Sequence, residues 1–229
     1  MKLLIKISGE GLSEGQEKFS EKMLSSVAEQ VKTLLDQGHQ IALVVGGGNL
    51  FRGKELSGKL SIDRATADYI GMLATVQNAL VLRDYFESKD ISTRVSSAIG
   101  MPQVCEEYIP KRTLRHMSKG RVVIFAAGLG MPYFSTDSCA VQRSLEIGAE
   151  MLVMAKNGVE GIYSADPKKD ENAEFIKHIT AKEVVERNLK VADLSAMGLA
   201  KENGLTIKIV ASDKIDRALD PEVGSTIES

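Results

Sequence analysis

Several residue types that mark particular protein classes are scarce in this sequence of 229 residues, which has no tryptophan, five prolines and only two cysteines. Cys105 and Cys139 form no CxxC pair and have no histidine nearby, which excludes a disulfide framework and a thiolate zinc site. The three histidines, His39, His116 and His178, show no metal-ligand spacing either. We therefore expect a protein of the reducing cytoplasm with no structural metal.

Long apolar runs and an excess of one charge are also missing. No segment approaches the roughly 20 apolar residues of a membrane-spanning helix. The apolar start LLIKI is interrupted by Lys6 and is too short for the core of a signal peptide. The formal net charge of -2 indicates neither a basic surface for nucleic acid nor an acidic tail. We expect no membrane and no nucleic acid among the partners.

Strand and helix signals alternate along the whole chain. Apolar, β-branched runs predict strands at residues 3–7, 39–45, 91–97, 121–128, 150–155 and 205–210. Helical spacing of apolar residues predicts long helices at 21–37 and 62–88, and Thr180 with Glu183 forms a capping box for a later helix. Alternating strands and helices, without a linker or repeat, predict an α/β fold. We expect one domain, a three-layer α/β/α sandwich around a mainly parallel sheet.

Shorter segments allow more specific expectations. Residues 105–117 predict a short helix broken near Pro110, and residues 158–167 a tight turn or hairpin. Residues 224–227 are typical of a final strand at the edge of the sheet.

Three glycines directly follow the second predicted strand, in VVGGGNLFRG at residues 44–53. In this order, a strand is followed by glycines, which have no side chain, and then by Arg52. Such an arrangement brings main-chain N–H groups and a guanidinium close to phosphate. A Cβ would block such an approach and would disfavour positive φ. A flexible turn is the alternative, but it needs one or two glycines rather than three. We interpret the segment as a phosphate-binding loop.

Two further strands end in residues that suit an anion. Lys6 lies within an otherwise apolar strand and precedes Ser8 and Gly9, and the strand at 121–128 runs into the glycines of residues 128–130. A buried lysine without a partner is costly, so Lys6 should face an anion, unless its strand lies at an edge open to solvent. Because ligands bind at the carboxyl ends of parallel strands, the three loops would open on one crevice if these strands are neighbours.

Asp137 begins the helix after the second glycine loop. It could orient Lys6 or help to hold a metal ion, or it could be only a helix N-terminal carboxylate stabilised by the dipole. Cations, positioned amide donors and a carboxylate are the parts that phosphoryl transfer requires. The sequence therefore favours phosphoryl transfer at this crevice.

The common nucleotide-binding signatures do not account for this site. GKELSGKL, residues 53–60, is close to the P-loop pattern, but Leu60 replaces the magnesium-binding hydroxyl and no strand leads into it. No GxGxxG lies between a strand and a helix, and the protein-kinase signatures HRD and DFG are absent.

Five segments in order, KISGE, VVGGGNLFRG, DYIGMLATVQN, GMPYFSTDS and GIYSADP, resemble the bacterial uridylate (UMP) kinases of the amino-acid kinase superfamily. The resemblance covers essentially the whole chain and implies the amino-acid kinase (carbamate kinase-like) fold. It also implies transfer of the ATP γ-phosphoryl group to UMP with Mg²⁺, which the ATP phosphates would mainly hold. Residues 1–150 would form the acceptor-binding lobe and residues 151–229 the ATP-binding lobe.

The resemblance also implies which residues form the site. The catalytic residues would be Lys6, Arg52 and Asp137. Contacts to ATP would come from Lys6, Ile7, Ser8, Gly9, Gly48, Arg52, Asn157, Tyr163 and Asp166. Contacts to UMP would come from Gly47, Asp68, Leu129, Gly130, Met131, Pro132, Tyr133, Phe134, Ser135 and Thr136.

Two departures from the family pattern stand out. Leu129 is where many relatives have threonine, so backbone contacts would replace a side-chain contact to uracil. The segment GLSEGQEKFSEK lacks the loop that accompanies GTP activation, which makes inhibition by UTP the more plausible regulation.

The resemblance also implies a homohexamer, with a dimer seam on the helix at 62–88. Two alternatives stay open: another small-molecule kinase of the superfamily, and a nucleotide-binding storage protein on the same fold.

Overall fold

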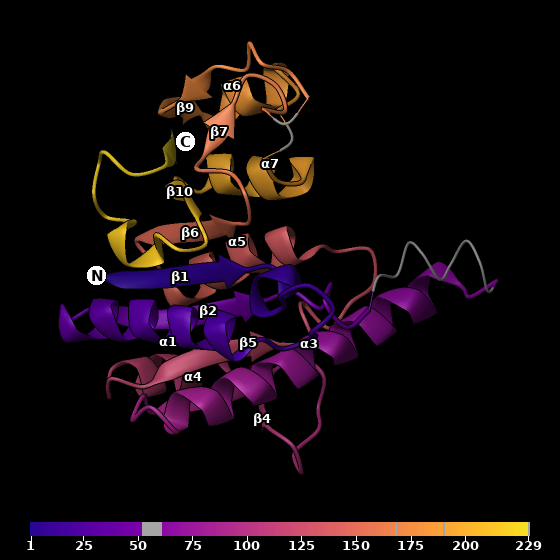
Figure 1. Cartoon of the computed structure of the whole chain (residues 1–229). Helices are drawn as coiled ribbons and strands as arrows, with labels where there is room; N and C mark the ends of the chain where they lie inside the picture. Colours follow the sequence, from indigo (N-terminus) through magenta and orange to yellow (C-terminus); the bar gives the residue numbers. More distant parts are fainter. Residues whose placement is uncertain (52–60, 168, 190, 229) are drawn as a thin grey trace.

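The computed structural model describes residues 1–51, 61–167, 169–189 and 191–228 (Figure 1). Within these ranges, nine strands form one sheet in the order β4-β3-β5-β2-β1-β6-β10-β11-β9. The first six strands along the chain are β1 (Lys2–Ile7), β2 (Gln40–Val45), β3 (Thr93–Ser97), β4 (Glu106–Glu107), β5 (Val122–Ala126) and β6 (Met151–Lys156). The last three are β9 (His178–Thr180), β10 (Ile207–Ala211) and β11 (Ser225–Glu228).

The sheet is mainly parallel, as predicted. The pairs between neighbouring strands are parallel except for β10 with β11, which is antiparallel. β1 lies between β2 and β6, and its residues Leu3 to Ile5 are fully buried. Burial on both faces explains why this strand is almost continuously apolar. The prediction that the last strand is an edge strand is wrong, because β9 pairs along the outer side of β11.

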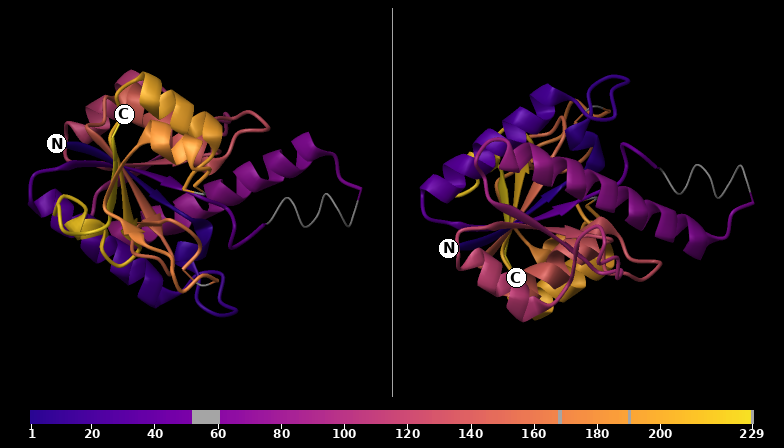
Figure 2. Two further views of the ribbon diagram at one scale, coloured as in Figure 1. Left: turned by 90° about the horizontal axis from the view of Figure 1, so that it is seen from above. Right: turned by 90° about the horizontal axis from the view of Figure 1, so that it is seen from below.

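Helices cover both faces of the sheet, which gives the predicted three layers (Figure 2). α1 (Glu21–Asp36) and α3 (Arg64–Glu87) pack on one face. α5 (Thr136–Ile147), α6 (Ala181–Glu186) and α7 (Leu194–Glu202) pack on the other. α4 (Pro110–Met117) lies on this second face, against β5.

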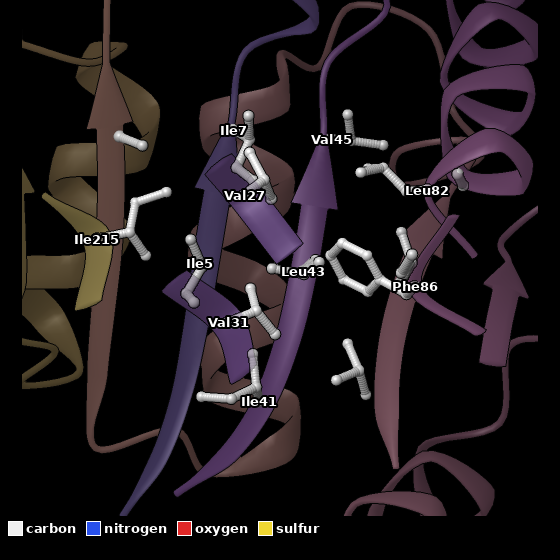
Figure 3. Packing of buried hydrophobic residues seen from close by; sticks show 14 of the residues in the cluster. Ile5, Ile7, Val27, Val31, Ile41, Leu43, Val45, Leu82, Phe86 and Ile215 are labelled. Atoms are coloured by element: carbon white, nitrogen blue, oxygen red, sulfur yellow. The ribbon is translucent and has the colours of Figure 1, made fainter. Parts of the chain in front are cut away.

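Alternation along β1 and β2 divides the core between the two faces. Ile5, Ile7 and Leu43 pack with Val31 of α1 and Phe86 of α3 (Figure 3). Leu4 and Val44 face the other way and pack among the residues of α5 and α7. Because successive side chains of a strand alternate between faces, Lys6 lies on the same face as Leu4. The α5 side of the sheet therefore receives the lysine.

α3 is the longest helix, with 24 residues. Its N-cap, Asp63, accepts hydrogen bonds from the main-chain N–H groups of Ala65 and Thr66. At a rise of about 1.5 Å per residue, the helix is about 36 Å long. Its N-terminal half extends past the end of the sheet (Figure 2). This projection carries Asp68 beyond the strand ends, where the loops lie.

Two short segments differ from their predicted form. Pro110 occupies the first turn of α4, where a missing N–H costs nothing, so it begins this helix instead of breaking it. Residues 158–167, predicted as a tight turn or hairpin, form no hairpin by themselves: they contain β7 (Ile162–Tyr163), which pairs with β8 (Phe175–Ile176) beyond them. Two 3₁₀ helices, η1 (Gly9–Leu12) and η2 (Ile215–Arg217), lie elsewhere in the chain. The capping box at Thr180 is confirmed.

Candidate active site

The three loops singled out in the sequence follow adjacent strands. β5, β2 and β1 are neighbours in the sheet and run parallel, so their carboxyl ends meet at one edge. Gly9 is packed directly against the first glycine loop, since a Cβ on it would lie 2.6 Å from the Gly48 nitrogen and the Asn49 side-chain oxygen. Only glycine allows this approach. The strands are therefore neighbours, as the predicted crevice requires, although Lys6, Ser8 and Gly9 line none of the three hollows described below.

Lys6 forms an ion pair with Asp137, in the first turn of α5, with 2.8 Å between Nζ and Oδ1. Only 8% of the Lys6 surface is exposed, so this carboxylate supplies the anionic partner that a buried lysine requires. The buried Oδ1 atom has no hydrogen-bond partner among the described residues, so the contact is an ion pair without hydrogen-bond geometry. The interpretation of Asp137 as a group that orients Lys6 fits this geometry.

A cavity of about 590 Å³ opens beside this ion pair, between α3 and the loop that leads into α5. Thr136, the residue before Asp137, is part of its wall. Its volume lies within the usual range for sites of small ligands. Eight of the ten predicted acceptor residues line it: Gly47, Asp68, Leu129, Met131, Tyr133, Phe134, Ser135 and Thr136. Gly130 and Pro132 belong to the same loop but are not part of the wall.

The acceptor loop, residues 128–135, is tied to both of its neighbouring helices. The main-chain N–H of Tyr133 donates to Asp68 Oδ2 of α3 at 2.8 Å. The Ser135 hydroxyl caps α5 and accepts from the N–H groups of Asp137 and Ser138, each at 3.1 Å. Met131, Tyr133 and Phe134 are 54%, 69% and 52% exposed. The loop thus offers large apolar side chains at the mouth of the cavity.

Asp68 is already engaged in this structure. Arg64 Nε lies 3.0 Å from both of its carboxylate oxygens, and the Arg64 guanidinium lies over the Tyr133 ring at 5.6 Å. Arg64 lines the cavity too. The carboxylate predicted to hold a ribose therefore shares its oxygens with an arginine and with the loop backbone.

Two further hollows, of about 620 and 600 Å³, lie near the carboxyl ends of β6 and β10. Tyr163 lines both, and its ring meets Phe175 edge-to-face with 5.4 Å between centroids. Asp166 and Lys156 line the larger one. These hollows contain two of the residues predicted to bind the ATP nucleoside, Tyr163 and Asp166.

Lys156 ends β6, next to β1, and its Nζ donates to the Val191 carbonyl at 2.7 Å. Burial lowers the pKa of Lys156, and the nearby positive charge of Lys6 lowers this pKa further, while Asp137 acts in the opposite direction. These electrostatic influences mean that Lys156, Lys6 and Asp137 lie close together. Lys6 and Asp137 line none of the three hollows themselves: Thr136, next to Asp137 in the chain, lines the acceptor cavity, and Lys156 lines the larger of the other two.

α3 also holds the first glycine loop. Asn78 is fully buried and donates to the Gly46 carbonyl and to Asn49 Oδ1, both at 2.7 Å. Asn49 returns a hydrogen bond to Asn78 Oδ1 at 3.1 Å and binds the Lys18 carbonyl at 2.8 Å. Gly47 lies against the same helix, since a Cβ there would come within 2.9 Å of Ala74 Cβ. Apart from its chain neighbours, no heavy atom of the described residues lies within 4 Å of a Cβ built on Gly48.

The structure does not bring every predicted residue into one hollow. Arg52 and the other residues of 52–60 lie outside the described residues. The Ile7 side chain is buried in the core, so only its main chain could meet a ligand. Asn157 is exposed and lines none of the three hollows described above. Gly47 and Gly48 both line the acceptor cavity, so this geometry does not assign them to different nucleotides.

Sequence reasoning missed Lys156, Arg64, Thr75 and Asn78. Lys156 had a visible signal, because it ends an apolar strand much as Lys6 does in β1. Thr75 and Asn78 are polar residues in the buried face of a long helix, which is itself a signal of a main-chain partner. Arg64 precedes Asp68 by one helical turn, a spacing that allows an ion pair.

The described residues offer few ligands for Mg²⁺ at this edge of the sheet. No group of three or more histidine, cysteine or acidic residues that could hold a metal occurs within the described ranges. Asp137 Oδ1 is a carboxylate oxygen at this edge, but it already lies 2.8 Å from the Lys6 ammonium, which would compete with a metal ion for it. Mg²⁺ usually binds through one or two carboxylates together with substrate phosphates. The residues therefore fit a metal held mainly by phosphate oxygens.

The described ranges contain no helix long and apolar enough to cross a membrane. Cys105 and Cys139 are free thiols, and burial raises the pKa of Cys139 to about 12.

Comparison with known proteins gives consistent matches along the chain. The model of the Amino acid kinase family matches residues 1–211. Uridylate kinase of Rhodococcus jostii (strain RHA1) is 47% identical over 232 residues, covering 100% of this chain and 95% of the relative. Uridylate kinase of Bifidobacterium longum (strain NCC 2705) is 45% identical, with coverages of 100% and 94%.

Among solved structures, UMP kinase from Bacillus anthracis matches with a TM-score of 0.95 at 35% identity, covering 99% of this chain and 95% of that one. UMP kinase from Ureaplasma parvum matches with a TM-score of 0.94 at 34% identity, with coverages of 100% and 98%.

Proposed function

This chain belongs to the amino acid kinase family, and on that premise we propose that it transfers the γ-phosphoryl group of ATP to UMP, giving UDP and ADP. The observation that carries the proposal is the Lys6–Asp137 ion pair, which adjoins Thr136 of the acceptor cavity and interacts with Lys156 of a second hollow. A charge clamp between two ligand sites is what phosphoryl transfer between two nucleotides requires. The reaction serves pyrimidine nucleotide synthesis in the cytoplasm.

In the proposed reaction, an oxygen of the UMP phosphate attacks the γ-phosphorus of ATP, and the bond from that phosphorus to the β–γ bridging oxygen breaks. Negative charge gathers on the transferring group and on the leaving ADP. Lys6 is positioned to stabilise this charge, and Asp137 holds the Lys6 ammonium in place at 2.8 Å. Little proton chemistry is needed, because the acceptor phosphate is already ionised at neutral pH.

The donor nucleotide would occupy the hollows lined by Tyr163 and Asp166, with its phosphates directed toward Lys6, Ser8 and Gly9. Lys156 adds a second positive charge beside Lys6. When bound, Mg²⁺ would neutralise charge on the ATP phosphates, which would hold most of its ligands. Arg52 and Gly48 remain predicted donor contacts.

UMP would occupy the cavity between α3 and residues 128–135. Its ribose hydroxyls would compete with Arg64 for Asp68, and the Thr136 hydroxyl at the N-terminus of α5 would meet its phosphate. Leu129 offers the uracil an apolar side chain, so polar recognition there would rely on main-chain groups. The acceptor lobe, residues 1–150, and the ATP lobe, residues 151–229, would form one domain, and both nucleotides would bind at the same edge of its sheet.

The proposed assembly is a homohexamer with a dimer seam on α3. Tyr69 and Leu73 support the seam, because these large apolar side chains of α3 are 43% and 47% exposed.

The direct test is a coupled assay of ADP release with ATP, Mg²⁺ and equal concentrations of UMP, CMP, dUMP or AMP. We expect UMP to be turned over at least tenfold faster than CMP or AMP, and chelation of Mg²⁺ to abolish the activity. Turnover of UMP no better than that of CMP or AMP would contradict the proposal. ATP binding without any phosphorylation would instead favour a storage protein on the same fold. Repeating the assay with GTP and with UTP distinguishes activation from inhibition at the acceptor site.

A further inference from the structure

The turn at residues 127–130, which begins the acceptor loop, has an unusual backbone. Ala127 and Gly128 have φ values of 59° and 56°, so two successive residues adopt the left-handed region. Ala127 is fully buried and, unlike glycine, pays a steric penalty for this conformation. Such a conformation persists only where surrounding contacts hold it.

The contact that holds the start of this turn comes from α3. The Thr75 hydroxyl accepts a hydrogen bond from the Ala127 N–H at 2.9 Å and donates its own proton to the Met72 carbonyl at 2.7 Å. Thr75 is 7% exposed, so water has little access to replace it. The hydroxyl is thus oriented by the helix and committed to the loop amide. Losing it would leave a buried N–H at a strained residue without its partner.

The far side of the turn is restrained separately. Arg143 Nη2 lies 3.4 Å from the Gly128 carbonyl, and Gly130 donates its N–H to the Ala127 carbonyl at 2.9 Å. Thr75 therefore holds the turn where it leaves β5, and the contacts of Gly128 and Gly130 hold the rest of the turn. Gly128 and Leu129 both line the acceptor cavity, so the position of its wall depends on this start.

We propose that Thr75, which also lines the acceptor cavity, is a positioning residue for the acceptor nucleotide, because its hydroxyl is committed to the main chain of residues 127–130. This inference rests on the proposed function for the identity of the acceptor. Because Leu129 is apolar, main-chain groups of this turn are the polar groups that can read the edge of a base there, and their placement sets selectivity. The donor hollows have no wall in common with the turn. The hydroxyl should therefore matter for UMP and not for ATP.

The test compares Thr75→Val, which keeps the shape and removes the hydroxyl, with Thr75→Ser, which keeps the hydroxyl. We expect Thr75→Val to raise the KM for UMP by about ten- to a hundredfold, the effect of leaving a buried donor unpaired, while the KM for ATP stays within about twofold. Thr75→Ser should restore the KM for UMP to within about threefold of wild type. The ratio of UMP to CMP turnover should fall in Thr75→Val.

The matched control is Thr33→Val. Thr33 lies in α1, is exposed, and its hydroxyl also donates to a helix carbonyl, that of Glu29 at 3.0 Å. This variant should leave both KM values unchanged. If Thr75→Val does not fold, Thr75→Ala is judged by the same criteria. A KM for UMP near the wild-type value, or equal increases for UMP and ATP, would overturn the inference.

Calorimetric binding of UMP to the wild type and to Thr75→Val gives a readout that does not depend on turnover. If wild type phosphorylates another nucleotide in place of UMP, the proposed function fails, and the Thr75 comparison is made with that acceptor. If wild type turns over UMP but Thr75→Val binds it normally, only the Thr75 inference fails.

Discussion

Lys6, Asp137 and Lys156 form a compact group of charges where β1 and β6 meet the start of α5. Each side chain is placed by an element of regular structure. Lys6 points to the α5 face because of strand alternation, and Asp137 meets it from the first turn of α5, which Ser135 caps. A site built on such elements holds its geometry better than one built on free loops.

Removing either charge of the Lys6–Asp137 pair should affect both turnover and stability. Lys6→Met should lower kcat by about 10²–10³-fold, as losing one preorganised charge typically does. Either single variant should lose about 1–3 kcal/mol in unfolding free energy, less than a fully buried pair, because both side chains retain some exposure. The double variant Lys6→Met with Asp137→Asn should lose less than the sum.

Coupled assays and urea unfolding measure these effects. Lys208→Met is the matched control, since Lys208 is a buried lysine whose Nζ bonds Thr226 Oγ1, away from the site. Its kcat should equal that of wild type. Unchanged turnover in Lys6→Met would remove Lys6 from the mechanism.

Lys156 should make stability depend on pH. Burial lowers its pKa in the folded protein below the value of about 10.4 that holds in the unfolded chain. Between these two values the unfolded chain binds one more proton, so the unfolding free energy of wild type rises with pH across this window. Lys156→Met lacks this contribution, and its stability relative to wild type should be highest near pH 7 and fall by pH 10. Urea unfolding at both pH values checks this, and a constant difference would contradict it.

At the scale of elements, α3 organises the loops around the acceptor cavity. Asp68 holds the Tyr133 amide, Thr75 holds the Ala127 amide, and Asn78 holds the Gly46 carbonyl. These three residues come from one helix, although the loops they hold follow two different strands. A displacement of α3 would therefore move both glycine loops together.

Gly9 and Gly48 should respond differently to the same substitution. A Cβ on Gly9 would collide with the first glycine loop, whereas a Cβ on Gly48 would meet no heavy atom of the described residues within 4 Å, its chain neighbours apart. Gly9→Ala should therefore cost about 1–3 kcal/mol of stability through overpacking, with a loss of activity. Gly48→Ala should change stability by less than about 0.5 kcal/mol but raise the KM for ATP, because the space it fills is the one predicted for phosphate.

Thermal unfolding and steady-state kinetics on the two variants separate these effects. A Gly48→Ala variant with unchanged KM values would show that this glycine does not face a ligand.

At the scale of the whole molecule, the sheet unites the two proposed lobes. β1 pairs with β2 of the acceptor half and with β6, which leads into the donor half. Lys6 and Asp137, the residues proposed to act on the transferring phosphoryl group, lie where these halves meet, at the end of β1. The exposed apolar side chains of α3 are then available for contact with a second copy.

Leu73→Glu should dissociate the proposed hexamer into smaller species. In a two-fold contact through α3, the substitution would bury two like charges, which costs several kcal/mol without partners. Size-exclusion chromatography with light scattering measures the mass. Val185→Glu on α6 is the control, as Val185 is 42% exposed outside the predicted seam. An unchanged mass for Leu73→Glu would place the interface elsewhere.

The features that could be predicted from the sequence depend on local signals. The long strands were readable from apolar runs, the start of α6 from its capping box, and the glycine loops from their composition, because each follows from neighbouring residues. β4, only two residues long, lies inside a segment predicted as helix. The sequence did not show that β1, β2 and β5 are neighbours in the sheet, since the pairing of strands depends on contacts between distant segments. The order of β11 and β9 was missed for the same reason: a strand's apolar pattern does not reveal which strand covers its outer side.

The sequence by itself determined the α/β class, Lys6 as a lysine in need of an anion, and the residues of the acceptor loop. Only the tertiary structure decided that Asp137 is that anion, and that Thr75 serves Ala127, 52 residues away in the sequence. The physical reason is that a polar residue in an apolar segment indicates that a partner must exist, while the identity of that partner depends on how the helices pack on the sheet. Packing of α3 against β5 brings the Thr75 hydroxyl to the main-chain N–H of Ala127, the strained residue directly before the acceptor loop.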